Sequence, residues 1–218
     1  MNGLPKGVIF DMDGVLLDSE PFITKAAMQM FAERGLAVQP EDFRPFTGAG
    51  EERFLGGVAE KYNFDFDIER DKTRTYDIYL DIIKGNLQPF AGVREFLKLC
   101  KDKGKKIAVA SSADMRKVRG NLKQMKIAPE TFDAVVVGDD VEHKKPSPDI
   151  FILAAQRIGL SPRDCLIIED AINGVEAAKA AGAKCLAITS SFSVEQLKAA
   201  DWFAPDLSQV PDEAINWR

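Results

Sequence analysis

The sequence contains few of the residues that metal sites and disulfide frameworks require. Its 218 residues include three cysteines and a single histidine, His143. The cysteines, Cys100, Cys165 and Cys185, form no Cys-x-x-Cys pair. The sequence therefore supports neither a disulfide framework nor a zinc site, and one histidine excludes a multi-histidine metal site.

The sequence also lacks a basic charge and a long apolar run. Its formal net charge is −5 at pH 7, so it has no field for non-specific binding to nucleic acid or to an anionic membrane. No apolar run approaches the roughly 20 residues of a transmembrane helix, and Met1–Lys6 leave no room for a secretory signal. We expect a cytoplasmic protein without nucleic-acid or membrane partners. Location in an organelle is the alternative if a transit peptide is removed. We also expect a monomer.

Five short apolar runs are predicted to be strands of a parallel sheet. They are continuous rather than alternating, which is typical of strands buried on both faces. The predicted strands are Gly7–Phe10, Lys106–Ala110, Ala134–Val137, Cys165–Ile168 and Lys184–Ile188. Helical stripes separate them, at Val93–Lys103, Asp149–Ile158 and Ala171–Ala181. This alternation predicts an α/β fold, a Rossmann-like doubly wound parallel sheet.

A long insertion follows the first predicted strand. Asp11 and Ser111 lie 100 positions apart, whereas a simple crossover unit needs roughly 30 residues. The surplus predicts a helical cap at 19–87 inserted into a core of 1–18 and 88–218. Its helices are expected from Ser19, as N-cap, to Arg34, and at Glu51–Tyr62 and Ile68–Lys84.

Acids, hydroxyls and lysines follow the predicted strands, at the edge where open α/β sheets bind ligands. They are Asp11 and Asp13, then Ser111 and Ser112, then Asp139, Asp140, Lys144 and Lys145, then Glu169 and Asp170, and finally Thr189, Ser190 and Ser191. Clustered carboxylates repel one another unless a cation intervenes. Oxygen ligands suit Mg²⁺, so we expect Mg²⁺ among Asp11, Asp13, Glu169 and Asp170.

A magnesium ion, a lysine and a serine hydroxyl together form a pocket for a phosphoryl group. One free carboxylate can then attack phosphorus. A second carboxylate can protonate the leaving oxygen and later deprotonate water. The residues therefore indicate magnesium-dependent phosphoryl transfer from a small phosphorylated molecule.

Four segments resemble the motifs of the haloacid dehalogenase superfamily. Asp11–Val15 resembles the first motif, and Ile107–Ser111 followed by Ser112 is similar to the second. Lys145–Asp149 resembles the third, and Ile168–Asp170 the fourth. The motifs occur in order and cover nearly the whole chain.

The resemblance implies a role for each motif residue. Asp11 would be the nucleophile and Asp13 the acid/base, and both would contact the metal, Asp13 through its backbone carbonyl. The other residues implied are Ser111, Ser112 and Lys145 for phosphate, and Asp170 and Glu169 for the metal.

The position of the insertion implies the helical-cap subclass, which includes sugar-phosphate phosphatases and β-phosphoglucomutase. Ile23 and Glu51 stand where the mutase carries a histidine and an arginine, so we favour hydrolysis, with a sugar phosphate as substrate, over a phosphomutase. Substrate selection is expected from Glu20, Gly48, Glu51 and Arg53, because specificity resides in such loops. A non-catalytic binding domain is a third hypothesis, which the intact motif acids and bases disfavour.

Overall fold

The computed structural model describes residues 5–46 and 50–216. These residues contain a six-stranded parallel sheet in the order β3-β2-β1-β4-β5-β6. The strands are β1 (Gly7–Phe10), β2 (Lys106–Ala110), β3 (Ala134–Val136), β4 (Cys165–Glu169), β5 (Lys184–Ile188) and β6 (Trp202–Ala204). The predicted α/β parallel sheet is confirmed. The sequence analysis missed β6, because it has only three residues and Pro205 follows it.

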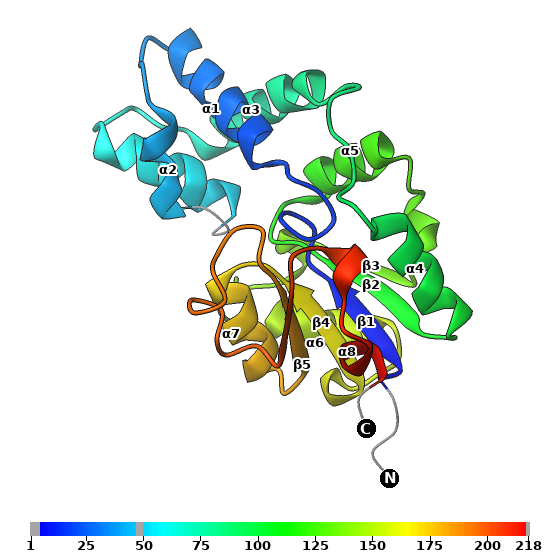
Figure 1. Ribbon diagram of the computed structural model, residues 1–218. Coiled ribbons are helices and arrows are strands. Elements are labelled where there is room, and N and C mark those ends of the chain that lie inside the picture. The colour runs from blue at the N-terminus through cyan, green and yellow to red at the C-terminus, as the bar shows by residue number, and fades with distance from the viewer. Residues whose placement is uncertain (1–4, 47–49, 217–218) are drawn as a thin grey trace.

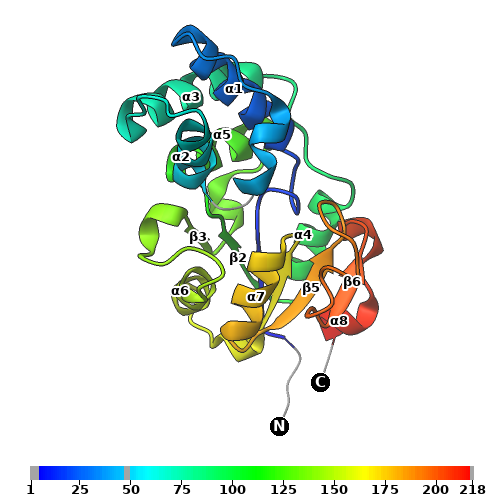
Figure 2. The ribbon, with the colours of Figure 1, turned by 90° about the vertical axis from the view of Figure 1, so that its left-hand side faces the viewer.

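Helices cover both faces of the sheet (Figures 1 and 2). Side chains such as Val8 and Phe10 pack with α4 (Val93–Asp102), α5 (Met115–Met125) and α8 (Asp212–Asn216). The alternate residue Ile9 packs with α6 (Asp149–Arg157) and α7 (Ile172–Ala180) on the other face. Burial on both faces explains why the strands are continuously apolar.

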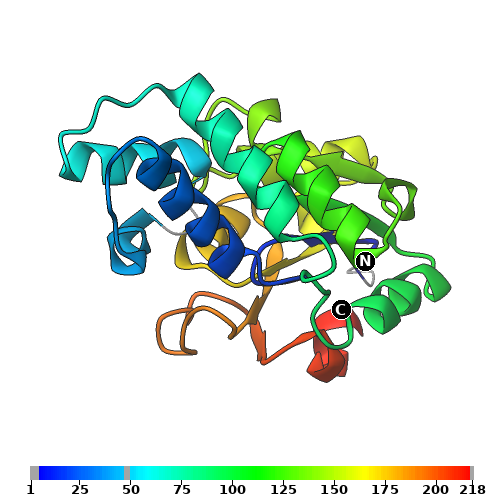
Figure 3. The same ribbon diagram turned by 90° about the horizontal axis from the view of Figure 1, so that it is seen from above.

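Three further helices lie beyond the carboxyl ends of the strands (Figure 1). They are α1 (Glu20–Glu33), α2 (Glu51–Lys61) and α3 (Ile68–Ile82). Seen from above, α3 lies between α1 and α5 (Figure 3). Their shared core includes edge-to-face contact of Phe31 with Phe64 and a tilted pair formed by Phe43 and Phe54, which bury large apolar areas.

The chain enters and leaves this helical group through adjacent segments. Leu17 forms an isolated antiparallel bridge with Pro89, and the Phe90 amide donates to the Leu16 carbonyl at 2.9 Å. The two crossings are therefore tied to each other directly below α1. Among the described helices, none combines the length and the apolarity that crossing a bilayer would need.

Helices α1 and α5 begin in different ways. Ser19 stands at the N-cap position of α1 but makes no capping hydrogen bond, because its hydroxyl donates to Asp13 instead. Helix α5 is capped by Asp114, whose carboxylate accepts from the amides of Arg116 and Lys117 at 3.0 and 3.1 Å.

Candidate active site

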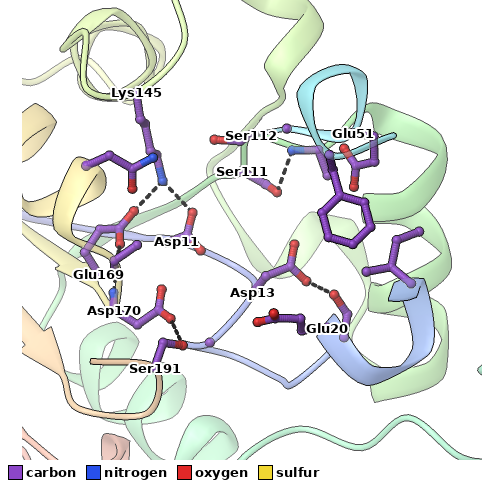
Figure 4. A pocket seen from close by; sticks show the side chains of 18 of the residues that line it. Asp11, Asp13, Glu20, Glu51, Ser111, Ser112, Lys145, Glu169, Asp170 and Ser191 are labelled. Atoms are coloured by element: carbon purple, nitrogen blue, oxygen red, sulfur yellow. Dashed lines mark hydrogen bonds and ion pairs between the residues drawn. The ribbon is translucent and has the colours of Figure 1, made fainter. Parts of the chain in front are cut away.

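One pocket, between the carboxyl ends of the strands and the helices α1 and α2, collects most of the predicted site residues (Figure 4). Those that line it are Asp11, Asp13, Ser111, Ser112, Lys145, Glu169 and Asp170 from the sheet side, and Glu20 and Glu51 from the helical side. Arg53 is not part of this lining. Gly48 lies outside the described residues.

Lys145 joins two carboxylates on neighbouring strands. Its ammonium donates to Oδ1 of Asp11 at 2.6 Å and to Oε1 of Glu169 at 2.5 Å (Figure 4). Burial alone would lower the pKa of Lys145, but the charges of Asp11 and Glu169 outweigh burial and raise it. Lys145 is therefore held as a cation at the end of β1.

Both carboxylate oxygens of Glu169 accept hydrogen bonds in this arrangement. Its second oxygen accepts the backbone amides of Asp170 and Ala171, both at 2.8 Å. Gly174 adjoins the same carboxylate so closely that a Cβ there would collide with it. Glu169 thus fixes both Lys145 and the turn after β4.

Asp170 has a different environment, with one hydroxyl donor and several acids nearby. Its carboxylate accepts from Ser191 and packs against Gly14, whose φ is +82° and where any Cβ would clash with it. Burial, together with the charges of Glu169 and Asp11, raises the pKa of Asp170 well above its usual value. Burial also raises the pKa of Asp11 from 3.8 to about 7.

The four carboxylates predicted to surround a metal ion are therefore divided. Within the described residues, no three acidic, histidine or cysteine side chains form a ready metal-binding cluster. Glu169 faces Lys145, and the Asp13 carboxylate faces Ser19 and Lys117. Only Asp11 and Asp170 remain as buried carboxylates whose charges are incompletely balanced. Their oxygens fit a hard cation that takes its other ligands from backbone carbonyls and water.

Asp13 is held from both sides. The Ser19 hydroxyl donates to Oδ1, and the Lys117 ammonium lies 3.1 Å from Oδ2. Lys117 lies equally close, at 3.1 Å, to Oε1 of Glu51 at the start of α2. Although burial opposes its charge, Asp13 and Glu51 together raise the pKa of Lys117. The fully buried Lys117 thus pairs with two carboxylates.

Sequence reasoning missed Lys117 as a site residue. It lies in the first turn of α5, where the helix dipole disfavours a cation. A lysine near the start of a helix, soon after the strand end that carries Ser111, is the sequence signal that could have identified it.

Ser111 and Ser112, which are predicted to bind phosphate, both line the pocket. Ser111 is buried at the end of β2, and its Oγ accepts the Ala113 amide at 3.2 Å (Figure 4). Both serines line the pocket opposite Asp13. Amides and hydroxyls that precede a helix N-terminus suit an anion.

The helical side of the pocket is apolar and acidic. Ile23, Phe46 and Phe54 line it together with Glu20 and Glu51. The Arg53 guanidinium lies over the Phe46 ring, 4.9 Å from its centroid, and pairs with Glu60 at 2.9 Å. Arg53 thus lies behind Phe46 rather than in the described lining, and its role in substrate selection stays a prediction.

The fold and the sequence together show the family. A family model described as haloacid dehalogenase-like hydrolase matches residues 8–188. The chain belongs to the haloacid dehalogenase-like hydrolases, and phosphatases among its relatives confirm the prediction of a phosphoric monoester hydrolase.

Two relatives and one solved structure illustrate the similarity. The Phosphorylated carbohydrates phosphatase of Thermotoga maritima is 33% identical, with 81% of this chain and 82% of that protein covered. Protein SUPPRESSOR OF QUENCHING 1, chloroplastic, of Arabidopsis thaliana is 45% identical over 91% of this chain, but the match spans only 19% of that longer protein. The crystal structure of CbbY from Rhodobacter sphaeroides in complex with phosphate shares the fold. Its TM-score is 0.87 at 24% identity, and the match covers 97% of this chain and 99% of that one.

Proposed function

We propose that the protein is a magnesium-dependent phosphatase that hydrolyses a small phosphorylated metabolite through a phosphorylated Asp11. One observation carries the proposal. The Asp11 carboxylate, at 2.6 Å from the Lys145 ammonium, opens into the same pocket as the Asp13 carboxylate and the Ser111 hydroxyl. Nucleophile, acid and phosphate-binding groups thus share one cavity.

The reaction has two balanced steps. In the first, an Asp11 oxygen forms a bond to phosphorus while the bond from phosphorus to the leaving oxygen breaks, and that oxygen takes a proton from Asp13. In the second, water attacks the same phosphorus and gives a proton to Asp13. The bond from phosphorus to Asp11 breaks, and inorganic phosphate leaves. Lys145, Ser111 and the amides after Ser111 hold the phosphoryl oxygens throughout.

Asp11 and Asp170 would hold Mg²⁺, with the backbone carbonyl of Asp13 as a further ligand. Bound there, the ion supplies charge neutralisation between the nucleophile and the phosphoryl oxygens. The raised pKa values of both carboxylates support this assignment, because a bound cation would stabilise the charged forms that burial and the neighbouring acids disfavour. Glu169 is assigned instead to holding Lys145.

Residues 19–87 are proposed to act as a cap over a core of 1–18 and 88–218. The paired crossings at Leu17 and Pro89 form a narrow connection on which α1–α3 could turn. Closure would exclude bulk water from the phosphorylated Asp11 until the leaving group departs.

A monophosphate with an uncharged leaving group, such as a sugar phosphate, fits this pocket best. Among the described residues, the cations that line it are Lys117 and Lys145, and each already pairs with two carboxylates. No unpaired cation in this lining awaits a second phosphate, as a mutase acting through a bisphosphate would need. The carbohydrate named for the Thermotoga relative supports the same class.

Phosphate release from a panel of sugar, polyol and carboxylate monophosphates tests the proposal, with Mg²⁺ and with EDTA. We expect release that needs Mg²⁺ and is greatest for uncharged leaving groups. Isomerised sugar phosphate with little free phosphate would favour the mutase, and no turnover on any substrate would favour a binding domain. The chloroplastic relative supports an organelle as an alternative location to the predicted cytoplasm.

A further inference from the structure

We propose that Lys117 is a positioning residue that aims the Asp13 carboxylate at the leaving group, and that Glu51 of the cap completes this arrangement when the cap is closed. The inference rests on the proposed function of Asp13 and of the cap. It assigns Lys117 no contact with the substrate.

The first observation is the complete restraint of Asp13. One of its carboxylate oxygens accepts a hydrogen bond from Ser19, and the other lies 3.1 Å from the Lys117 ammonium. The carboxylate group therefore cannot rotate without losing a partner. The Asp13 side chain is 32% exposed and borders the pocket, whereas the Lys117 side chain is only 6% exposed. Lys117 thus supports Asp13 from within the protein rather than from the pocket mouth.

The second observation is that two lysines have the same arrangement. Lys145 is shared by Asp11 and Glu169, and Lys117 is shared by Asp13 and Glu51. Glu169 belongs to β4 of the core, so the first arrangement is permanent. Glu51 begins α2 of the cap, so the second is complete only while the cap is closed.

The ion pair of Lys117 with Glu51 is more deeply buried than the ion pair of Arg116 with Asp77, which also joins α5 to the cap. Its two side chains are 6% and 9% exposed, whereas Arg116 and Asp77 are 39% and 47% exposed. Burying an ion pair is costly, and an apolar pair would pack more cheaply. Retaining three charged groups there is explained if one of them, Asp13, must point in a fixed direction.

The test compares two substrates that differ in their need for Asp13 as an acid. An alkyl phosphate requires protonation of its leaving oxygen, whereas p-nitrophenyl phosphate releases a stable phenolate. The value of kcat/KM reports the steps up to phosphorylation of Asp11, before Asp13 acts as a base. We expect Lys117→Met to lower kcat/KM for the alkyl ester by about 10- to 100-fold and for the aryl ester far less.

Three further variants complete the experiment. Lys117→Arg should restore much of the alkyl activity. Glu51→Gln should change the ratio of alkyl to aryl kcat/KM in the same direction by a smaller factor. Adding Glu51→Gln to Lys117→Met should lower kcat/KM for the alkyl ester little further. Arg116→Met is the matched control, because it removes an α5–cap ion pair that does not touch Asp13, and its ratio should equal that of the wild type.

The possible results separate this inference from the proposed function. Equal losses of kcat/KM on both esters in Lys117→Met, or an altered ratio in Arg116→Met, would overturn the role of Lys117. If Lys117→Met does not fold, Lys117→Arg and Glu51→Gln decide by the same ratio. If the wild type hydrolyses neither ester with Mg²⁺, the proposed function fails first, and this inference fails with it.

Discussion

The Lys145 ammonium lies 2.6 Å from Oδ1 of Asp11, although 134 positions separate the two residues in the chain. The crossovers of the parallel sheet bring them together, because Asp11 directly follows β1 and Glu169, which also holds Lys145, ends the neighbouring strand β4. The proposed nucleophile is therefore oriented by the fold before substrate binds. A preformed arrangement of this kind lowers the cost of reaching the transition state.

Magnesium is expected to stabilise the folded protein through Asp11 and Asp170. At about 100 times its dissociation constant, a ligand adds ~2.7 kcal/mol, which raises Tm by about 5–10 °C for a chain of this size. Asp170→Asn should remove most of this shift. The control variant Asp139→Asn alters an exposed acid outside the pocket lining. It should retain the full shift in Tm with Mg²⁺. Thermal unfolding with Mg²⁺ and with EDTA gives the measurement, and an unchanged shift in Asp170→Asn would refute the assignment.

The metal-free protein should lose stability as pH rises, through Asp11. Burial raises the pKa of Asp11 from 3.8 to about 7, so the folded state binds this proton more tightly than the unfolded chain does. Ionisation therefore destabilises the fold progressively between these two values, and the full cost is present above the higher one. Each pKa unit corresponds to about 1.4 kcal/mol, so the cost is at most about 4 kcal/mol.

Asp11→Asn isolates this contribution, because the variant cannot ionise there. Its free energy of unfolding in EDTA, relative to wild type, should increase between about pH 4 and pH 7 and should increase much less with Mg²⁺ bound. Urea unfolding at several pH values measures the difference. A difference that is flat across this window would show that Asp11 titrates normally.

A second anionic group on the substrate should reduce turnover. The described pocket lining has no cation free of carboxylate partners, and residues 47–49, which lie outside the described residues, are Thr, Gly and Ala and carry no charge. A sugar bisphosphate should therefore show a kcat/KM at least about tenfold below that of the monophosphate. Glu20→Gln should narrow this gap by removing a like charge from the lining, and Glu52→Gln, outside the lining, should not. Faster turnover of the bisphosphate would contradict the pocket's charge balance.

Asp71 should be the main electrostatic link between α1 and α3. Its buried carboxylate accepts from Arg34 at 2.6 Å, from Arg70, and from the Asp67 amide at 2.9 Å. We expect Asp71→Ala to lower the free energy of unfolding by roughly 2–4 kcal/mol, because it leaves these donors unpaired.

Asp65→Ala is the matched control for that change. The Asp65 side chain is 97% exposed and lies 3.6 Å from the same Arg34, so its loss should cost less than about 1 kcal/mol. Denaturant unfolding compares the two variants. Equal costs would show that Asp71 contributes no more than a surface ion pair.

The sequence was most informative at the strand ends. Asp11, Ser111 and Glu169 end or follow continuous apolar runs, and the carboxyl ends of parallel strands must meet at one edge. Their proximity could therefore be predicted from the sequence. The strand ranges could also be predicted closely, because a strand that is buried on both faces is a continuous apolar run in the sequence.

The positions of the remaining site side chains depend on tertiary packing, which the spacing of residues along the sequence does not reveal. Lys117 reaches Asp13 from inside α5, and Ser19 turns its hydroxyl from the helix end to the same carboxylate. Arg53 stacks on Phe46, a residue of the pocket lining, and is not itself part of that lining. Which way a long side chain points is decided by its packing partners, and these come from distant segments.

The central claim is that Asp11 carries the phosphoryl group covalently, and acid-quenched single turnovers test it most directly. With substrate labelled in its phosphoryl group and Mg²⁺ present, the account predicts protein-bound label in the first turnover. The label should be released by hydroxylamine, map to the peptide that contains Asp11, and be absent from Asp11→Asn. Inorganic phosphate that forms in the first turnover without any labelled protein would show direct attack by water and would contradict the account.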